Sequence, residues 1–232
     1  MPRTAMIDET GLARLLAWLS PAFPVGAYSY SHGLEYAVEA GALRDRSSVE
    51  RWIDTILAHG AGRIDAALFL EAHRAVRGDD VARLSDVLEL AAAMRGSGET
   101  ALEARAQGSA FVGALANAWS DAALSPWLEA LGPSPSYAVA VATAAAAIGI
   151  DAAPALTAYL HAFAANLVSA AVRLVPLGQT DGQRITAALV GRLPALVAAA
   201  QRRPFAEIGG SALVVDWTSM LHETQSTRLF RS

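Results

Sequence analysis

Helix-forming residues fill this 232-residue chain in runs that are separated by helix-capping residues. Alanine and leucine dominate the runs, β-branched stretches are short, and Gly, Pro, Ser and Asp recur between the runs. Alanine and leucine have high helix propensities, whereas Ser and Asp cap helix starts and Gly and Pro end helices. The 53% of hydrophobic residues supply ample material for a core. The pattern predicts an all-α fold, with one domain over residues 1–232 built as a bundle of about nine or ten helices.

Apolar spacing and start signals place the individual helices. Behind a cap at Thr10, leucines recur at helical spacing until Pro21 and Pro24 end the first helix. Ser47 and Glu50 have the spacing of a capping box, in which each side chain bonds the other residue's backbone amide. The first helix is expected to use the leucines Leu12, Leu15, Leu16 and Leu19. The ranges predicted as helical are 10–19, 47–59, 63–77, 80–94, 98–118, 126–131, 136–149, 152–175, 181–202 and 212–223.

Charge and cysteine content exclude several classes of partner and site. The 18 basic and 22 acidic residues are interspersed and leave a net charge of −4, so we expect no nucleic-acid partner. The absence of cysteine excludes disulfides, thiolate metal sites and a cysteine nucleophile. Residues 1–9 carry one basic residue and then acids where a signal peptide would have its apolar run, which indicates a cytoplasmic protein.

One apolar stretch has the length of a membrane span. Residues 152–172 contain no Asp, Glu, Lys or Arg. Much of the stretch is alanine, which is only weakly apolar, and Pro154, His161 and Asn166 suit a buried helix of a bundle better than a lipid-facing one. We therefore expect no membrane interaction.

The five histidines do not have the spacing of a metal site. They are His32, His59, His73, His161 and His222. No two lie three or four residues apart, which is the interval that places two imidazoles on one helical face, and there is no His-Glu-x-x-His motif. Each is better explained as a surface or hydrogen-bonded core histidine. We expect no metal site and no tightly bound cofactor.

Motifs for catalysis fail on spacing as well. The Gly-rich stretch 95–100 lacks the Lys-Ser/Thr pair and the preceding strand of a phosphate-binding loop, so Ser97 is read as a helix cap. No Gly-x-Ser-x-Gly elbow is present, and the paired acids Asp79 and Asp80 suit a solvated helix start. No catalytic residue is expected.

Two segments have more apolar and aromatic character than a loop or a chain end requires. Residues 20–35 form a Pro/Gly loop with three aromatic rings, which either plug the core or shape a contact surface. Residues 222–232 keep Leu229 and Phe230 between two arginines close to the end of the chain. Such a tail docks on its own domain or orders in a partner's groove, and we predict residues 224–232 to be a partner-docking tail.

These segments resemble the urease accessory protein UreF. The family's Ser-Pro-x-x-Pro-Val-Gly-x-x-x-x-Ser-x-Gly-Leu-Glu block stands here as residues 20–35, and its Pro-Leu-Gly-Gln block stands within residues 173–183. His222-Glu223 and residues 228–232 match its C-terminal signature. The matching motif positions are Pro21, Pro24, Gly26, Ser31, Gly33, Leu34, Glu35, Pro176, Gln179 and Gln183. Two mild departures, Phe23 and Thr227, keep apolar or hydroxyl character.

The resemblance implies a non-catalytic, all-α homodimer that binds the accessory protein UreD (also called UreH) and recruits the GTPase UreG. That assembly delivers nickel to apo-urease when GTP is hydrolysed, with the UreF-type protein as a regulator of the GTPase. By the motif, Tyr28 and Arg228 hold the tail in shape for complex formation. The implied partner-binding residues are Tyr28, His222, Glu223, Arg228, Leu229 and Phe230. Arg228 and Arg231 are not assigned as catalytic arginine fingers.

Two other functions stay open on the sequence alone. One is a self-contained nickel carrier, which the lack of cysteine and of spaced histidines disfavours. The other is a helical enzyme with a pocket that no known motif marks. Tight nickel binding by the isolated chain would favour the carrier.

Overall fold

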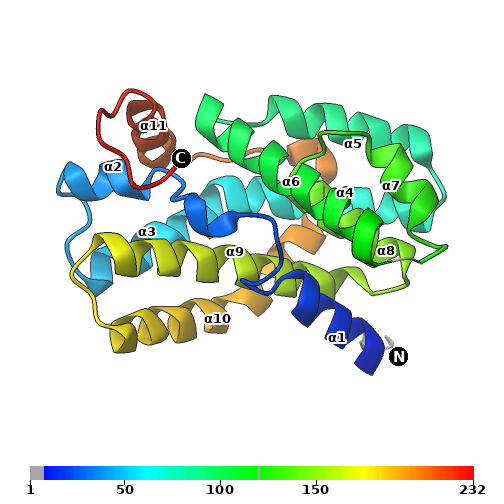
Figure 1. The fold of residues 1–232 in the computed structure, drawn as a ribbon, viewed down its shortest axis with the longest axis horizontal. Coiled ribbons are helices and arrows are strands. Elements are labelled where there is room, and N and C mark those ends of the chain that lie inside the picture. Colours follow the sequence, from blue (N-terminus) through cyan, green and yellow to red (C-terminus); the bar gives the residue numbers. More distant parts are fainter. Residues whose placement is uncertain (1–7, 120) are drawn as a thin grey trace.

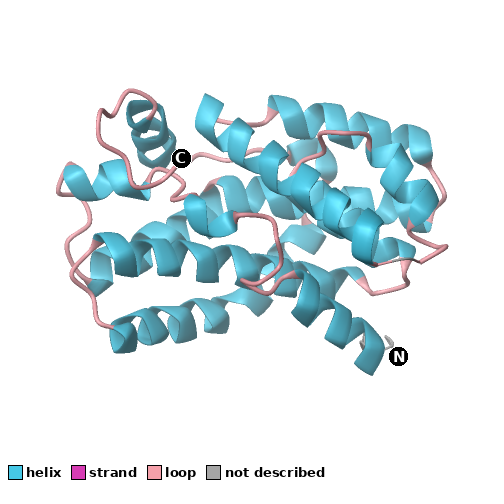
Figure 2. Ribbon diagram, in the orientation of Figure 1, coloured by secondary structure: helices cyan, strands magenta, loops and turns pink. Residues whose placement is uncertain are grey.

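The computed structural model describes residues 8–119 and 121–232, and these residues are helical throughout, with short loops between the helices (Figure 2). Most of the stretch that was used to predict the absence of a signal peptide lies outside the described residues. The α-helices are α1 (Glu9–Trp18), α2 (Leu34–Glu39), α3 (Arg46–His59), α4 (Ala61–Arg77), α5 (Val81–Ala93), α6 (Gly98–Ala118), α7 (Ser125–Leu131), α8 (Tyr137–Ala147), α9 (Ala152–Leu174), α10 (Gln179–Arg202) and α11 (Leu213–His222). Two short 3₁₀ turns, Ala27–Ser29 and Phe205–Glu207, complete the described elements.

The all-α prediction is confirmed. Each of the ten predicted helical ranges overlaps one observed helix, and the additional helix is the six-residue α2 that follows the Pro/Gly loop. Observed starts differ from predicted ones by up to two residues, as for α4 and α10. Ser97 caps α6, and Asp80 caps α5, as expected.

Two predicted helix caps are wrong. The first helix is capped by the Asp8 carboxylate, which accepts a hydrogen bond from the Gly11 amide at 2.5 Å, and not by Thr10. Helix α3 is capped by Asp45, which exchanges hydrogen bonds with Ser48. The capping box therefore lies two residues before the predicted pair of Ser47 and Glu50. In each case an aspartate just upstream has the extended backbone that an N-cap needs.

The apolar face predicted for the first helix is also wrong in part. Leu15 is buried together with Trp18, whereas Leu12 and Leu16 are 46% and 67% exposed. Trp18 stacks edge-on against Phe111 of α6, with 6.1 Å between the ring centroids. The large indole therefore decides which side of α1 faces the core.

The core surrounds α8. Every residue from Ala138 to Ala146 is buried, and α8 packs against α4, α6, α7 and α9. Alanine side chains are small, so neighbouring helices approach α8 closely on all sides. The alanine-rich stretch is therefore the centre of the bundle.

Helices α9 and α10 run side by side along one flank of the molecule (Figure 1). α9 is long and apolar enough to cross a membrane, but half of its most apolar window is buried inside the protein. α9 contacts α10, α4, α8 and α3, and it therefore serves as a core helix of the bundle.

The C-terminal helix α11 lies at one end of the bundle, beside α2 and the start of α6 (Figure 1). The chain beyond α11 loops back toward the Pro/Gly loop that precedes α2. The two segments that the sequence marked as unusual are thus brought together by the fold.

Candidate functional site

The three aromatic rings of the 20–35 loop have different surroundings. Phe23 is half-buried and packs on Phe111, with ring centroids 5.4 Å apart, and Tyr30 is buried. Tyr28 is 70% exposed. Two of the three rings therefore fill the core, as the first interpretation predicted, and the third faces outward. A contact surface at Tyr28 stays a prediction.

The backbone of this loop turns at two glycines. Gly26 and Gly33 have φ angles of +70° and +77°, a region in which a side chain is strained. Gly33 also lies against α11, since a Cβ atom there would be 2.9 Å from the Ser219 nitrogen. Pro21 and Pro24 are exposed on the outer side of the loop. The glycine at position 33 therefore permits the close contact between α2 and α11.

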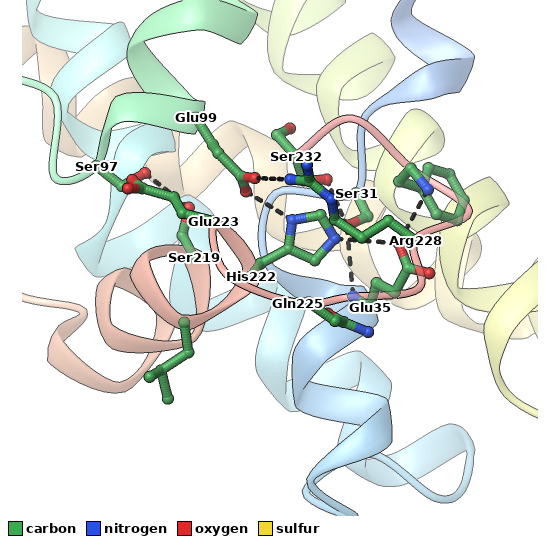
Figure 3. A network of polar contacts seen from close by, with 12 residues as sticks. Ser31, Glu35, Ser97, Glu99, Ser219, His222, Glu223, Gln225, Arg228 and Ser232 are labelled. Carbon is green, nitrogen blue, oxygen red and sulfur yellow. Dashed lines mark hydrogen bonds and ion pairs between the residues drawn. The ribbon is translucent and has the colours of Figure 1, made fainter.

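Glu35, in the first turn of α2, holds the C-terminal tail. Its carboxylate accepts hydrogen bonds from the main-chain amides of Leu229 at 2.6 Å and Phe230 at 2.9 Å. The neighbouring Leu34 is fully buried and anchors α2 to the core. A buried carboxylate needs such donors, because an unpaired one would be strongly destabilising. Figure 3 shows the side chain of His222 beside this carboxylate.

His222 lies fully buried between two carboxylates. Its Nδ1 is 2.7 Å from Glu99 Oε2 and its Nε2 is 3.1 Å from Glu35 Oε2. The doubly protonated imidazole is the form that donates to both. Arg228 donates to the other oxygen of Glu99 at 2.7 Å. Burial raises the pKa of the Glu99 carboxyl, although the hydrogen bond from His222 and the charge of Arg228 oppose this shift.

Two further contacts attach α11 to the start of α6. The Glu223 carboxylate accepts a hydrogen bond from the Gly98 amide at 2.9 Å. The hydroxyls of Ser97 and Ser219 are 2.7 Å apart and buried. The predicted residue Glu223 therefore contacts its own chain near a helix N-terminus, where an acidic group is favoured.

The final residue of the tail is enclosed by polar groups. Ser31 donates from its main-chain amide to the carbonyl of Ser232 at 2.6 Å, and the Ser232 hydroxyl donates to Glu103 at 3.0 Å. Glu103 also lies 3.3 Å from Nδ1 of His32 and accepts a hydrogen bond from Gln107 at 3.1 Å. Ser232 is fully buried. The tail is therefore fastened at both Glu35 and Glu103.

Arg173, near the end of α9, connects all three motif blocks. It donates to the main-chain oxygen of Tyr28 at 2.8 Å, and its guanidinium lies 4.4 Å from the centroid of the Phe230 ring. A guanidinium over an aromatic face is attracted by the ring's electrons. The other motif residues of this block are exposed around the start of α10 and do not join the network: Pro176, Gln179 and Gln183.

The predicted partner-binding residues divide into an inner and an outer set. His222 and Phe230 are buried and hold the tail to its own domain. Tyr28 and Leu229 are 70% and 66% exposed, and they face outward from the loop and the tail. The tail thus docks on its own domain, and its binding to a partner stays a prediction.

Helix α11 has an unusual distribution of side chains. Its inner side carries Thr218, Ser219 and His222, all buried and polar. Its outer side carries four apolar residues at helical spacing, with exposures of 76%, 63%, 61% and 46%: Leu213, Val214, Trp217 and Met220. Within the described parts of the chain, no other helix exposes as many large apolar side chains. An exposed apolar face of this kind marks an interaction surface.

Sequence reasoning missed three residues of this site. Glu99 and Glu103 occupy successive turns of α6, and Arg173 lies in the last turn of α9. An acid in the first turn of a helix is ordinarily explained by the helix dipole, so Glu99 gave no signal of its buried partners. The i, i+4 spacing of the two glutamates on one helical face was the available signal.

The histidines do not take part in a metal-binding cluster within the described part of the chain. Residues 8–119 and 121–232 hold no group of three or more His, Asp or Glu side chains arranged for a metal ion. His59 is the last residue of α3 and His73 lies within α4. The two helices are separate because the helical conformation is interrupted at Gly60. His73 instead donates from Nε2 to the carbonyl of Ile150 at 2.8 Å.

Known proteins resemble this chain over nearly its whole length. A family model described as UreF matches residues 43–190. A urease accessory protein UreF from Rhodopseudomonas palustris (strain HaA2) is 48% identical over 221 residues, which cover 95% of this chain and 93% of the relative. One from Granulibacter bethesdensis is 46% identical and covers 99% of this chain and 97% of the relative. One from Magnetococcus marinus is 43% identical, with 98% and 100% covered.

Proposed function

The chain belongs to the UreF family of urease accessory proteins, and from that membership we propose that it is a scaffold for nickel insertion into urease. Family members take part in urease maturation as non-catalytic accessory proteins. The scaffold binds a UreD/UreH-type protein, recruits and regulates a UreG-type GTPase, and acts on apo-urease. It works in the cytoplasm as a homodimer.

The observation that carries this proposal is the outer face of α11. Leu213, Trp217 and Met220 are exposed, while the opposite side of the same helix is fixed to the protein by buried polar contacts. A rigidly held helix that presents apolar side chains is suited to docking a protein partner. We assign this face to the UreD/UreH-type protein, because the tail that bears the family signature leaves directly from this helix.

Co-purification with a UreD-type protein tests this surface. We expect Trp217→Glu to weaken binding by at least about tenfold, since truncating an interface tryptophan costs about 2 kcal/mol or more. Leu16→Glu is the matched control, because Leu16 is 67% exposed on α1, and it should bind normally. If Trp217→Glu binds as tightly as the wild type, α11 is not the docking face. Failure of the unaltered chain to bind both a UreD-type and a UreG-type protein would overturn the scaffold proposal itself.

The proposal includes no tightly bound cofactor. Nickel and GTP belong to the pathway, with nickel as cargo and GTP as the substrate of the partner. Calorimetry of the isolated chain with nickel distinguishes the scaffold from the alternative of a nickel carrier. Sub-micromolar binding would favour the carrier, and weak or absent binding is the expected result.

A further inference from the structure

Asp216 lies at one edge of the apolar outer face of α11. It stands three residues after Leu213 and four before Met220, so the three side chains are neighbours on the helix surface. The aspartate is half-buried, whereas the two apolar side chains are exposed. The face that we propose as the docking surface therefore has an acidic group at its border.

The fold makes room for this carboxylate beside the connection between α5 and α6. A Cβ atom at Gly96 would lie 2.7 Å from Asp216 Oδ1, which is closer than two such atoms approach. A residue with a side chain at position 96 would therefore displace the carboxylate. The glycine allows Asp216 to lie against the main chain of this connection, where it is partly shielded from water.

The Asp216 carboxylate has no hydrogen bond or arginine partner within residues 8–119 and 121–232. Burial raises the pKa of this carboxyl, and the charge of His32 only partly opposes the shift. No hydrogen bond contributes to lowering the pKa. Arg95, which immediately precedes the connection's glycine, donates to Asp65 at 2.8 Å instead. The chain thus brings an acidic group out of bulk water without supplying a cation for it.

The dipole of α11 does not account for this arrangement. Asp216 is the acidic residue in the first turn of the helix, where a negative charge is favoured. That effect acts on an exposed carboxylate as well, so it does not require burial. A half-buried carboxylate without a donor is destabilising in the free chain, and a cation from a partner would relieve this cost when the face is covered.

The charges of α11 decide which kind of partner fits the face. Residues 213–222 contain no Lys or Arg, and Glu223 follows Asp216 two turns later on the same edge. A second copy of this helix would bring acids together without a basic group of its own, and like charges disfavour such a contact. A protein with an apolar groove and an arginine or lysine at its rim is complementary both to the apolar side chains and to the acid.

We propose that Asp216 pairs with a basic side chain of the protein that docks on α11, an arginine or lysine at the rim of an apolar groove. The inference rests on the proposed docking of a UreD/UreH-type protein to this face and adds the chemistry by which that protein is recognised. The apolar side chains supply the contact area, and the ion pair fixes the register of the partner along the helix. Because docking removes more water from the carboxylate, a protein without the cation binds poorly.

The affinity of Asp216→Asn for a UreD-type protein tests the ion pair. The substitution keeps the shape of the side chain and removes its charge. We expect the Kd to rise at least about tenfold, because the partner's cation is left without its counter-charge. The melting temperature of the free variant should not fall, because the carboxylate has no partner to lose in the free chain. A purely structural role of Asp216 would instead lower the melting temperature.

Asp86→Asn is the matched control, since Asp86 is an aspartate of α5 with a side chain that is 71% exposed, and it should bind as the wild type does. If Asp216→Asn binds as tightly as the wild type while Trp217→Glu is weakened, the ion pair is overturned and the docking face stands. If both variants of α11 bind as the wild type does, the docking face and the ion pair are both overturned. An equal loss of affinity in Asp86→Asn would indicate general attraction between charged proteins, and a lower melting temperature of Asp216→Asn would assign the carboxylate to the chain's own fold. Either result overturns the ion pair.

Light scattering of the isolated chain tests whether a second copy covers the face instead. We expect the wild type, Asp216→Asn and Trp217→Glu to have the same oligomeric state. A change of oligomeric state in the two variants would place a second copy of the chain on α11, and it would overturn the proposal.

Discussion

At Glu35, two main-chain amides of the tail and one imidazole converge on a single carboxylate. Hydrogen bonds to a charged group contribute about 1.5–3 kcal/mol each, so this residue governs how often the tail detaches. We expect Glu35→Gln to raise exchange of the Leu229 and Phe230 amides with solvent deuterium by at least about tenfold. Amide hydrogen exchange followed by NMR measures this directly.

Glu39 provides the comparison for that experiment. It is an exposed glutamate of the same helix, and it accepts a hydrogen bond from Gln225 at 2.5 Å. Because exposed contacts contribute little, Glu39→Gln should leave the amide protection of the tail nearly unchanged. Equal exchange in both variants would show that the Glu35 carboxylate does not hold the tail.

His73 gives the protein a component of acid sensitivity. Burial lowers the pKa of this imidazole below its ordinary 6.5. The unfolded chain therefore takes up a proton before the folded one as the pH falls, and this part of the stability is present above about pH 6.5 and lost as the pH falls through the folded pKa. Between about pH 7 and pH 5, the free energy of unfolding should fall more in the wild type than in His73→Gln, as denaturant titrations would measure. His161→Gln, at an exposed site, should behave as the wild type, and identical pH slopes for all three proteins would contradict the prediction.

At the scale of elements, the contact between α2 and α11 depends on one glycine. A Cβ atom at position 33 would meet the main chain of Ser219 at 2.9 Å, in addition to the strain of a φ angle of +77°. At Gly26, with a φ angle of +70°, the nearest atom would be 3.9 Å away. We expect Gly26→Ala to reduce the free energy of unfolding by about 1 kcal/mol, from backbone strain alone. Gly33→Ala should reduce it by about 3 kcal/mol, because α11 must also move.

Thermal and denaturant unfolding of the two glycine variants separate strain from packing. The strain is common to both positions, so the difference between them measures the α2–α11 contact. Equal losses would mean that α11 adjusts without cost, and the tail would then rest on a compliant helix.

Helix positions were predictable from the sequence, and so were the caps of α5 and α6, whereas the caps of α1 and α3 were not. Aspartate and hydroxyl residues stand close together around the starts of α1 and α3, and any of them has the chemistry of a cap. The choice of Asp8 and Asp45 depends on which residue the fold holds in an extended conformation. Helix propensity is a local property that can be predicted from the sequence. The backbone conformation of a capping residue also depends on the packing of distant parts of the chain.

At the scale of the whole molecule, the loop and the tail were recognisable as sites, but their contacts were not. Glu99 meets His222, and Glu35 meets Phe230, across most of the chain. No periodicity encodes a pairing between residues so far apart, and only the fold brings them together. The loop residue Tyr28 was marked by its aromatic character, and its exposure became known from the structure alone.

The tail from Gln225 to Ser232 is held by contacts whose gain is close to the cost of ordering it. Fixing the backbone of each residue costs about 1–2 kcal/mol of conformational entropy. Hydrogen bonds to charged groups contribute about 1.5–3 kcal/mol each, and one buried phenyl ring adds to them. The entropic cost offsets most of this stabilisation. A chain ending at Thr224 should therefore keep its helical circular dichroism and lose only a few degrees of melting temperature, by roughly the 2–4 °C expected for about 1 kcal/mol in a domain of this size. The same truncation should abolish the complex with UreD-type and UreG-type proteins, measured by co-purification, because the ordered tail supports the surface that they bind. Normal assembly of the truncated chain would show that the tail is not needed for docking. A large loss of helicity would show that the tail is part of the core instead.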